Sequence, residues 1–165
     1  MVRVAVPADA GGIARVHIAS WQVAYDGVFP SDFLGSLDLE VRTGWWEALL
    51  RRKERITFVA DAEDGIAGFS LIGPSEDAGW GEVFAIYVHP THWAKGIGRD
   101  LIGASERQLA EDGFEQALLW VLQGNDRARA FYERQGWVEG KPIRLETIGG
   151  TEITEVRYER GLELP

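Results

Sequence analysis

The apolar positions near the start of the chain follow two different periods. Residues 2–6 form a short apolar run, which predicts a strand. Further on, apolar side chains recur at intervals of three and four up to the pair at 26–27, Asp-Gly. This spacing predicts a helix that buries Ile13, Val16 and Trp21.

A second helix is predicted over residues 38–52. It ends in the cationic run at 51–53, and positive charge is favoured at the C-terminus of a helix. The residues expected on its inward face are Val41, Trp45, Ala48 and Leu49. Between the two helices, the segment Pro30-Ser31-Asp32 predicts a loop or a short turn.

From residue 56 onward the pattern alternates between strands and helices. The predicted elements are strands over 56–60, 66–72 and 81–88, a helix over 98–113, a strand over 117–122, a helix over 127–135, and strands over 137–146 and 153–158. Asn125 or Asp126 is expected to cap the helix over 127–135, and Gly136 is expected to end it in a left-handed turn. Without repeats or linkers, residues 1–165 are predicted to form one α+β or α/β domain with a mixed sheet.

Composition narrows the class of protein. The 165 residues are 45% hydrophobic and 26% charged, which is typical of a soluble globular fold. A net charge of −9 opposes binding to nucleic acid or to an anionic membrane. The chain has no cysteine, which excludes disulfides, thiolate zinc sites and a cysteine nucleophile. With no secretory signal pattern and no long apolar run, we expect a cytoplasmic protein. The three histidines, His17, His89 and His92, do not predict a metal site.

The sharpest local motif is the segment 93–99, Trp-Ala-Lys-Gly-Ile-Gly-Arg, between a predicted strand and a predicted helix. Glycines let the backbone approach a ligand there, and the N–H groups at the start of a helix bind phosphate or pyrophosphate. A dinucleotide fingerprint would need Gly or Ala where Leu101 stands, and the Gly-Lys-Ser/Thr of a triphosphate loop is absent. A tight turn without a ligand is the alternative to a phosphate site.

These residues carry a family resemblance. The run Glu82–Pro90, the loop Gly96-Ile97-Gly98, and the segment from Leu119 through Asn125 to Trp137 resemble the GNAT superfamily of acetyl-coenzyme A dependent N-acetyltransferases. The resemblance implies a single-domain α+β fold. Its sheet is central, twisted, mixed and mostly antiparallel, with helices on both faces and a parallel strand pair that splays apart at the cofactor site. One departure is Trp93, where the family usually has Arg or Gln.

The resemblance also implies roles for particular residues. Acetyl-coenzyme A, the co-substrate, is expected to contact the backbone of Ile86, Tyr87 and Val88, the loop residues Lys95, Gly96, Ile97, Gly98 and Arg99, and the side chains of Asn125 and Tyr132. The Tyr132 phenol is the expected catalytic acid toward the departing thiolate. Trp21 and Tyr25, one helical turn apart, are expected to line the acceptor pocket.

A protonated amine must lose a proton before it can attack, and Glu82 is the candidate base. The alternative for Glu82 is an exposed carboxylate at a strand end. Trp120 stands where some relatives carry a glutamate base, so no base is expected there. No metal is expected to take part.

The function expected from these observations is transfer of an acetyl group from acetyl-coenzyme A to a primary amine by direct attack. The acceptor is expected to be a small amine or a peptide N-terminus, and a homodimer is left open as the oligomeric state. Two alternatives are a non-catalytic acyl-coenzyme A binding or sensing module, and a structural domain in which 96–98 is only a turn.

Overall fold

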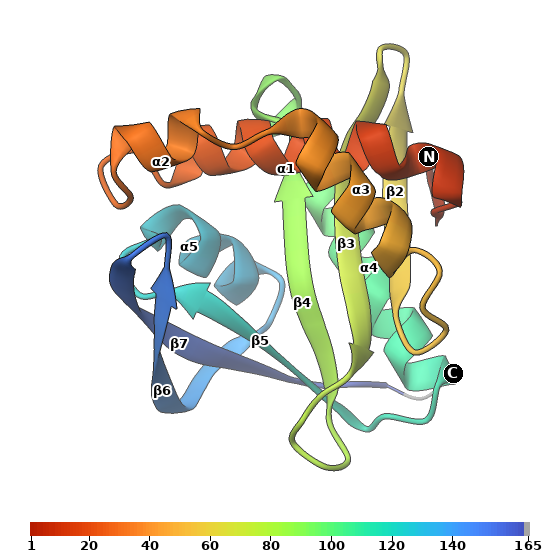
Figure 1. Cartoon of the computed structure of the whole chain (residues 1–165). Coiled ribbons are helices and arrows are strands. Elements are labelled where there is room, and N and C mark those ends of the chain that lie inside the picture. Colours follow the sequence, from red (N-terminus) through yellow and green to blue (C-terminus); the bar gives the residue numbers. More distant parts are fainter. Residues whose placement is uncertain (164–165) are drawn as a thin grey trace.

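A seven-stranded mixed sheet runs through the centre of the molecule (Figure 1). The computed structural model describes residues 1–163. The strands are β1 (Val2–Val4), β2 (Ile56–Ala62), β3 (Gly65–Pro74), β4 (Gly81–Val88), β5 (Gln116–Leu122), β6 (Val138–Ile148) and β7 (Thr151–Gly161). They lie in the order β1-β2-β3-β4-β5-β7-β6, and every pair is antiparallel except β4 and β5.

Helices cover both faces of the sheet. They are α1 (Ala10–Ala24), α2 (Ser31–Gly35), α3 (Leu39–Leu49), α4 (Ile97–Glu111) and α5 (Asp126–Arg134), and short 3₁₀ turns occur at Pro7–Asp9 and Pro90–His92. In Figure 1, α1 and α3 cross in front of the sheet and α4 lies behind it. The mixed sheet and two-sided helical cover predicted from the resemblance are therefore confirmed.

Alternation along the strands separates two cores. Phe58 and Ala60 of β2 pack with α4 and α5 into one cluster, which we call the α4 cluster. Val59 between them packs against α1 and α3. Successive side chains of a strand point to opposite faces, so β2, β3 and β4 each supply both clusters. This explains why β5 is apolar almost throughout and buried on both faces, as predicted.

The parallel pair β4 and β5 separates after a short contact. Pairing covers only Gly81–Val83 against Ala117–Leu119, although β4 continues to Val88. On its other edge β4 is bulged at Phe84, because Ala85 pairs with Leu71 and Val83 pairs with Ile72. A bulge bends a strand and increases its twist, so β4 turns away from β5 beyond this point. Figure 1 shows the two arrows diverging.

Several predicted boundaries and faces are wrong. The strand expected over 2–6 ends at Val4, the segment after Pro30 forms the short helix α2, and α3 ends at Leu49 rather than at residue 52. Trp21 is half-buried rather than part of the core. These differences come from tertiary contacts, which override local pattern at element ends.

The inward face of α3 also differs from the prediction. Trp46 is 0% exposed, while Val41 and Trp45 are 73% and 48% exposed, and Ala48 is exposed as well. Leu49 packs against the core, as predicted. The Trp46 ring lies edge-on to Phe69, with ring centroids 4.9 Å apart, and its Nε1–H donates to His17 Nδ1 at 3.2 Å. A buried tryptophan needs such a partner, and His17 supplies it at position 46.

We predict that Trp46→Ala lowers the free energy of unfolding by about 3–5 kcal/mol, because it removes a fully buried ring and leaves a cavity. The matched change Trp45→Ala, on the half-exposed neighbour, is expected to cost less than about 1 kcal/mol. Urea unfolding followed by circular dichroism measures both values. Equal losses for the two variants would contradict the assigned face of α3.

Candidate active site

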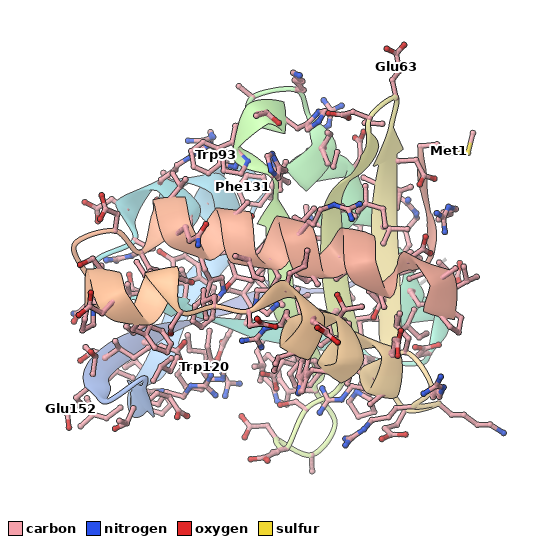
Figure 2. All side chains as sticks on the ribbon, turned by 45° about the horizontal axis from the view of Figure 1, so that its top comes forward. Met1, Glu63, Trp93, Trp120, Phe131 and Glu152 are labelled. Atoms are coloured by element: carbon pink, nitrogen blue, oxygen red, sulfur yellow. The ribbon has the colours of Figure 1, made fainter. Side chains whose placement is uncertain are left out.

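A cavity of about 1360 Å³ opens where β4 and β5 separate. We call the wall formed by residues 92–99 and α5 the loop half, and the wall formed by α1, Phe29, Arg55, residues 75–77, β6 and β7 the α1 half. In the view of Figure 2, Trp93 and Phe131 of the loop half lie above the α1 ribbon, and Trp120 of β5 lies below it. The cavity therefore passes between the separated strands.

The loop half contains the N-terminus of α4. Gly96 caps the helix in a left-handed conformation, at φ 82°, which glycine adopts without strain. The first helical hydrogen bond runs from the Asp100 N–H to the Gly96 carbonyl. The N–H groups of the three residues between them therefore lie outside the helical ladder, and Gly96 to Arg99 all line the cavity. These groups are the ones from which the motif at 93–99 predicts an anion site, and their geometry suits one.

Gly98 keeps this site open to a ligand. A Cβ at position 98 would lie 3.3 Å from the Phe131 ring and 3.8 Å from Val88. The loop, β4 and α5 meet there, and any side chain would fill the space between them. The free N–H groups and this bare glycine fit the pyrophosphate of a nucleotide cofactor.

Trp93 braces the end of β4. Its Nε1–H donates to the Val88 carbonyl at 2.8 Å, and the Ser20 hydroxyl of α1 donates to the same oxygen at 3.1 Å. The carbonyl that ends β4 is thus bonded by side chains of two other elements. The Arg127 guanidinium lies 3.3 Å from the centroid of the Trp93 ring and lines the cavity. Sequence reasoning did not single out Arg127 or Ser20, because these contacts join distant segments.

Tyr132 lies in α5 on the loop half and is 8% exposed. Its ring packs in the α4 cluster, close to Phe131 and Trp137. Burial raises the pKa of the Tyr132 hydroxyl above that of a free phenol, so the group stays protonated at neutral pH. Among residues 1–163 the hydroxyl has no hydrogen-bond partner, which leaves its proton available for donation into the cavity.

Asn125 does cap α5, as predicted. Its Oδ1 accepts a hydrogen bond from the Ala128 N–H at 3.1 Å, and the residue lines the cavity. Gly136 has φ 86° and ends the helix in the predicted left-handed turn. The helix that carries Tyr132 is therefore fixed at both ends.

Glu82 lies in the last stretch where β4 still pairs with β5, opposite Leu118. It is 7% exposed, so the alternative of an exposed strand-end carboxylate is wrong. Its neighbour Val83 packs in the α4 cluster, which turns Glu82 toward the α1 face of the sheet. Its Oε2 accepts a hydrogen bond from the Ser75 hydroxyl at 2.8 Å. Burial raises the pKa of Glu82, and this outweighs the lowering by the Ser75 bond and by nearby arginines.

Aromatic side chains form the part of the α1 half where α1 meets β4. The Trp21 and Tyr25 rings are 5.1 Å apart, and the Tyr25 hydroxyl lies 3.1 Å from that of Tyr87. Burial raises the pKa of both tyrosines. His17 stacks on Tyr87, with ring centroids 5.5 Å apart, and burial lowers the pKa of His17 to about 3. A neutral His17 is thus part of the wall that fixes Tyr87.

The structure gathers nearly all the residues predicted from the sequence. Twelve line the one cavity: Trp21, Tyr25, Glu82, Ile86, Tyr87, Val88, Gly96, Ile97, Gly98, Arg99, Asn125 and Tyr132. Lys95 is exposed and lies outside the lining. Ile86 and Val88 face the α4 cluster, while the Tyr87 side chain faces α1.

Residues 1–163 lack two features, a membrane-spanning helix and a cluster of metal ligands. No helix of that part of the chain has both the length and the apolar character needed to cross a membrane. In the same range, no three His, Asp or Glu side chains converge as metal ligands would.

Comparisons with known proteins identify the family. Residues 19–137 match the model of the acetyltransferase (GNAT) family. The chain is 35% identical over 128 residues to YuaI, an uncharacterized N-acetyltransferase of Bacillus subtilis, covering 75% of this chain and 72% of that protein. It is 25% identical over 162 residues to a probable N-acetyltransferase of Mycobacterium tuberculosis, covering 95% and 91% of the two chains.

The fold also matches a solved structure. The PaiA N-acetyltransferase of Thermoplasma acidophilum, solved in complex with coenzyme A, superposes with a TM-score of 0.73 at 20% identity and 98% coverage of both chains. The family match covers more than half of the sequence and includes β4, the loop at 93–99 and α5. The chain therefore belongs to the GNAT family of acetyl-coenzyme A dependent N-acetyltransferases.

Proposed function

We propose that this acetyltransferase transfers the acetyl group to a primary amine by direct attack, without a covalent enzyme intermediate. The observation that carries the proposal is the pairing of Glu82 and Tyr132 across one cavity. Glu82 faces it from the α1 side of the sheet, and Tyr132 faces it from α5. A base and an acid on opposite sides of an opening suit a transfer between two molecules that meet inside it.

Acetyl-coenzyme A supplies an activated thioester, and the loop half is the proposed place for it. The free N–H groups of Ile97, Gly98 and Arg99 would hold the pyrophosphate. Backbone groups of β4 from Ile86 to Val88, which have no pairing with β5, would bind the pantetheine arm and polarise the thioester carbonyl. Asn125, which lines the same cavity, is proposed as a further contact.

Proton transfers would fall to the two buried groups. The Glu82 carboxylate accepts a proton from the ammonium form of the acceptor, directly or through water, so that the neutral amine attacks. The Tyr132 hydroxyl donates its proton, or a hydrogen bond, to the departing thiolate. The burial of Glu82 and the protonated state of Tyr132 favour this proposal over a non-catalytic binding module, which needs neither group.

The α1 half is the proposed acceptor pocket, with Trp21 and Tyr25 in its wall. A small amine or a peptide N-terminus is the proposed acceptor class. We also propose a cytoplasmic location, which accords with a chain free of cysteine, and a second copy of the chain as a partner. Release of free coenzyme A from acetyl-coenzyme A, measured with a panel of amines, tests the activity itself. Binding of the coenzyme without release in the presence of any amine would favour the sensing module instead.

We predict that Gly98→Val weakens binding of coenzyme A by about 10- to 100-fold, because the side chain fills the approach to the helix N-terminus and removes charge-assisted hydrogen bonds. The control is Gly103→Val, the same change within α4, where a Cβ meets only the Arg107 side chain at 3.5 Å. Calorimetric titration gives both affinities. Unchanged affinity in Gly98→Val would remove the loop from the proposed cofactor site.

We predict that Glu82→Gln lowers turnover by about 10²-fold or more, with little change in coenzyme affinity, because the amide cannot accept the proton. Glu63→Gln, at the exposed tip of the β2–β3 hairpin (Figure 2), is the control. Turnover of Glu82→Gln within a few-fold of wild type from pH 6 to 9 would exclude Glu82 as the base.

Glu82→Gln is expected to raise the stability of the fold although it lowers turnover. A carboxyl whose pKa is raised by folding stabilises the fold fully only below its unfolded pKa, and this contribution is lost as pH rises through the folded pKa. Glu82→Gln is therefore expected to have a higher melting temperature than wild type at neutral pH. The difference should shrink on acidification.

We predict that Tyr132→Phe lowers turnover by about 10- to 10³-fold with little change in melting temperature. The hydroxyl has no hydrogen bond to residues 1–163, so its removal costs the fold little. Tyr158→Phe is a control for which we expect the opposite pattern. The Tyr158 hydroxyl donates to Glu133 at 2.7 Å and accepts from Arg129. This variant should lose stability and keep turnover. The reverse pattern would make Tyr132 a packing residue.

A further inference from the structure

One arginine in the α1 half has a side-chain nitrogen that donates no hydrogen bond to any of residues 1–163. Arg55 lies in the connection between α3 and β2, and it lines the cavity. Its guanidinium carbon is 3.4 Å from the centroid of the Phe84 ring. Because Phe84 is the bulged residue of β4, the guanidinium is fixed beside the place where β4 and β5 separate.

The missing side chain of Gly73 leaves room for Arg55 at this position. A Cβ on Gly73 would lie 2.7 Å from the Glu54 carbonyl oxygen and 3.1 Å from the Arg55 Cδ. Gly73 is the cross-strand partner of Glu82. The Arg55 side chain therefore crosses the sheet over the residue paired with Glu82, and both charged groups reach the same cavity.

This guanidinium forms no ion pair within residues 1–163, although the Glu82 carboxylate lies close enough to feel its charge. None of residues 1–163 accepts a hydrogen bond from Arg55 Nη1, which is closed off from solvent, and no carboxylate of that range forms an ion pair with Arg55. Arg144, across the cavity, differs in this respect because its Nε lies 2.5 Å from a Glu155 carboxylate oxygen. A half-buried, unpaired cation is unfavourable, so its cavity-facing edge is a site for an anion.

The chemistry of the site points to one kind of anion. A guanidinium presents two parallel N–H groups that match the two oxygens of a carboxylate. Glu82 lies next to Arg55 and attracts an ammonium group. Together they present opposite charges to the two ends of a short molecule.

Building on the proposed function, we propose that the acceptor is an amine that also carries a carboxylate, an amino acid or a similar small zwitterion, whose carboxylate binds Arg55 while its amine lies beside Glu82. Arg55 is then the residue that determines acceptor specificity. An amine without a carboxylate would leave the guanidinium unpaired and would bind more weakly.

The test compares matched acceptors. Glycine, β-alanine and 4-aminobutyrate are each assayed against their carboxamides by release of coenzyme A. For at least one pair, wild type is expected to prefer the carboxylate in kcat/KM, and Arg55→Met should reduce that preference about 10- to 100-fold while the carboxamide rate stays within about threefold. Differences in amine pKa cancel, because wild type and variant are compared on the same acceptors. Arg52→Met, an exposed arginine of the same connection, is the control.

A second measurement separates this inference from the proposed function. The N-acetylated acids of the same series, and their amides, are titrated into the complex with coenzyme A, with no turnover required. Arg55-dependent binding of the acids without acetylation of any amine would support the carboxylate site and overturn the proposed function. Acetylation with no carboxylate preference, or with equal losses for acid and amide in Arg55→Met, would overturn the carboxylate site alone. Equal losses of kcat/KM for acid and amide in Arg55→Met, together with a shifted pH profile, would mean that Arg55 acts only through Glu82.

Discussion

The separation of β4 from β5 is the constraint on which the rest of the site depends. Two adjacent parallel strands normally satisfy each other's backbone groups, but here pairing stops at Val83 while β4 continues to Val88. The bulge at Phe84 turns β4 away, and hydrogen bonds from Trp93 and Ser20 to the Val88 carbonyl hold its far end. Backbone groups that face a cavity need partners, so the free edge of β4 can pair with water or with a ligand that enters the opening.

Burial at this opening raises the pKa of two ionisable groups, and each shift suits a different proton transfer of the proposed reaction. Removing Glu82 and Tyr132 from water raises the pKa of each, because the charged form loses hydration. For the carboxyl, a higher pKa makes a stronger base, which suits the role proposed for Glu82 toward the ammonium form of the acceptor. For the phenol, it keeps the proton in place until a negative charge develops beside it. The same physical effect thus favours a base on one side of the sheet and an acid on the other.

Local pattern predicted the parts of the fold that depend on neighbours in sequence. The loop at 93–99, the Asn125 cap and the left-handed Gly136 each rest on a few consecutive residues, and each is confirmed. The face of α3 was mispredicted because Trp45 and Trp46 are adjacent and periodicity alone does not choose between them; the partner His17 decides it. The bulge at Phe84 depends on pairing with β3, and the position of Arg55 depends on Gly73. No local pattern records such long-range contacts.

Charged side chains are distributed unevenly around the cavity, so its two halves attract different ligand groups. Three arginines line the loop half, Arg99, Arg127 and Arg134, and no carboxylate among residues 1–163 lines it. In the α1 half and on the adjoining part of β4, Glu76, Asp77, Glu82, Glu146 and Glu155 outnumber Arg55 and Arg144. In a protein with a net charge of −9, a cationic wall is a local exception, and it lies on the side proposed for an anionic cofactor. The acidic wall attracts an ammonium group, and within it Arg55 is the cation that forms no ion pair with a carboxylate of residues 1–163. An acceptor with charges of both signs is the one that satisfies this wall completely.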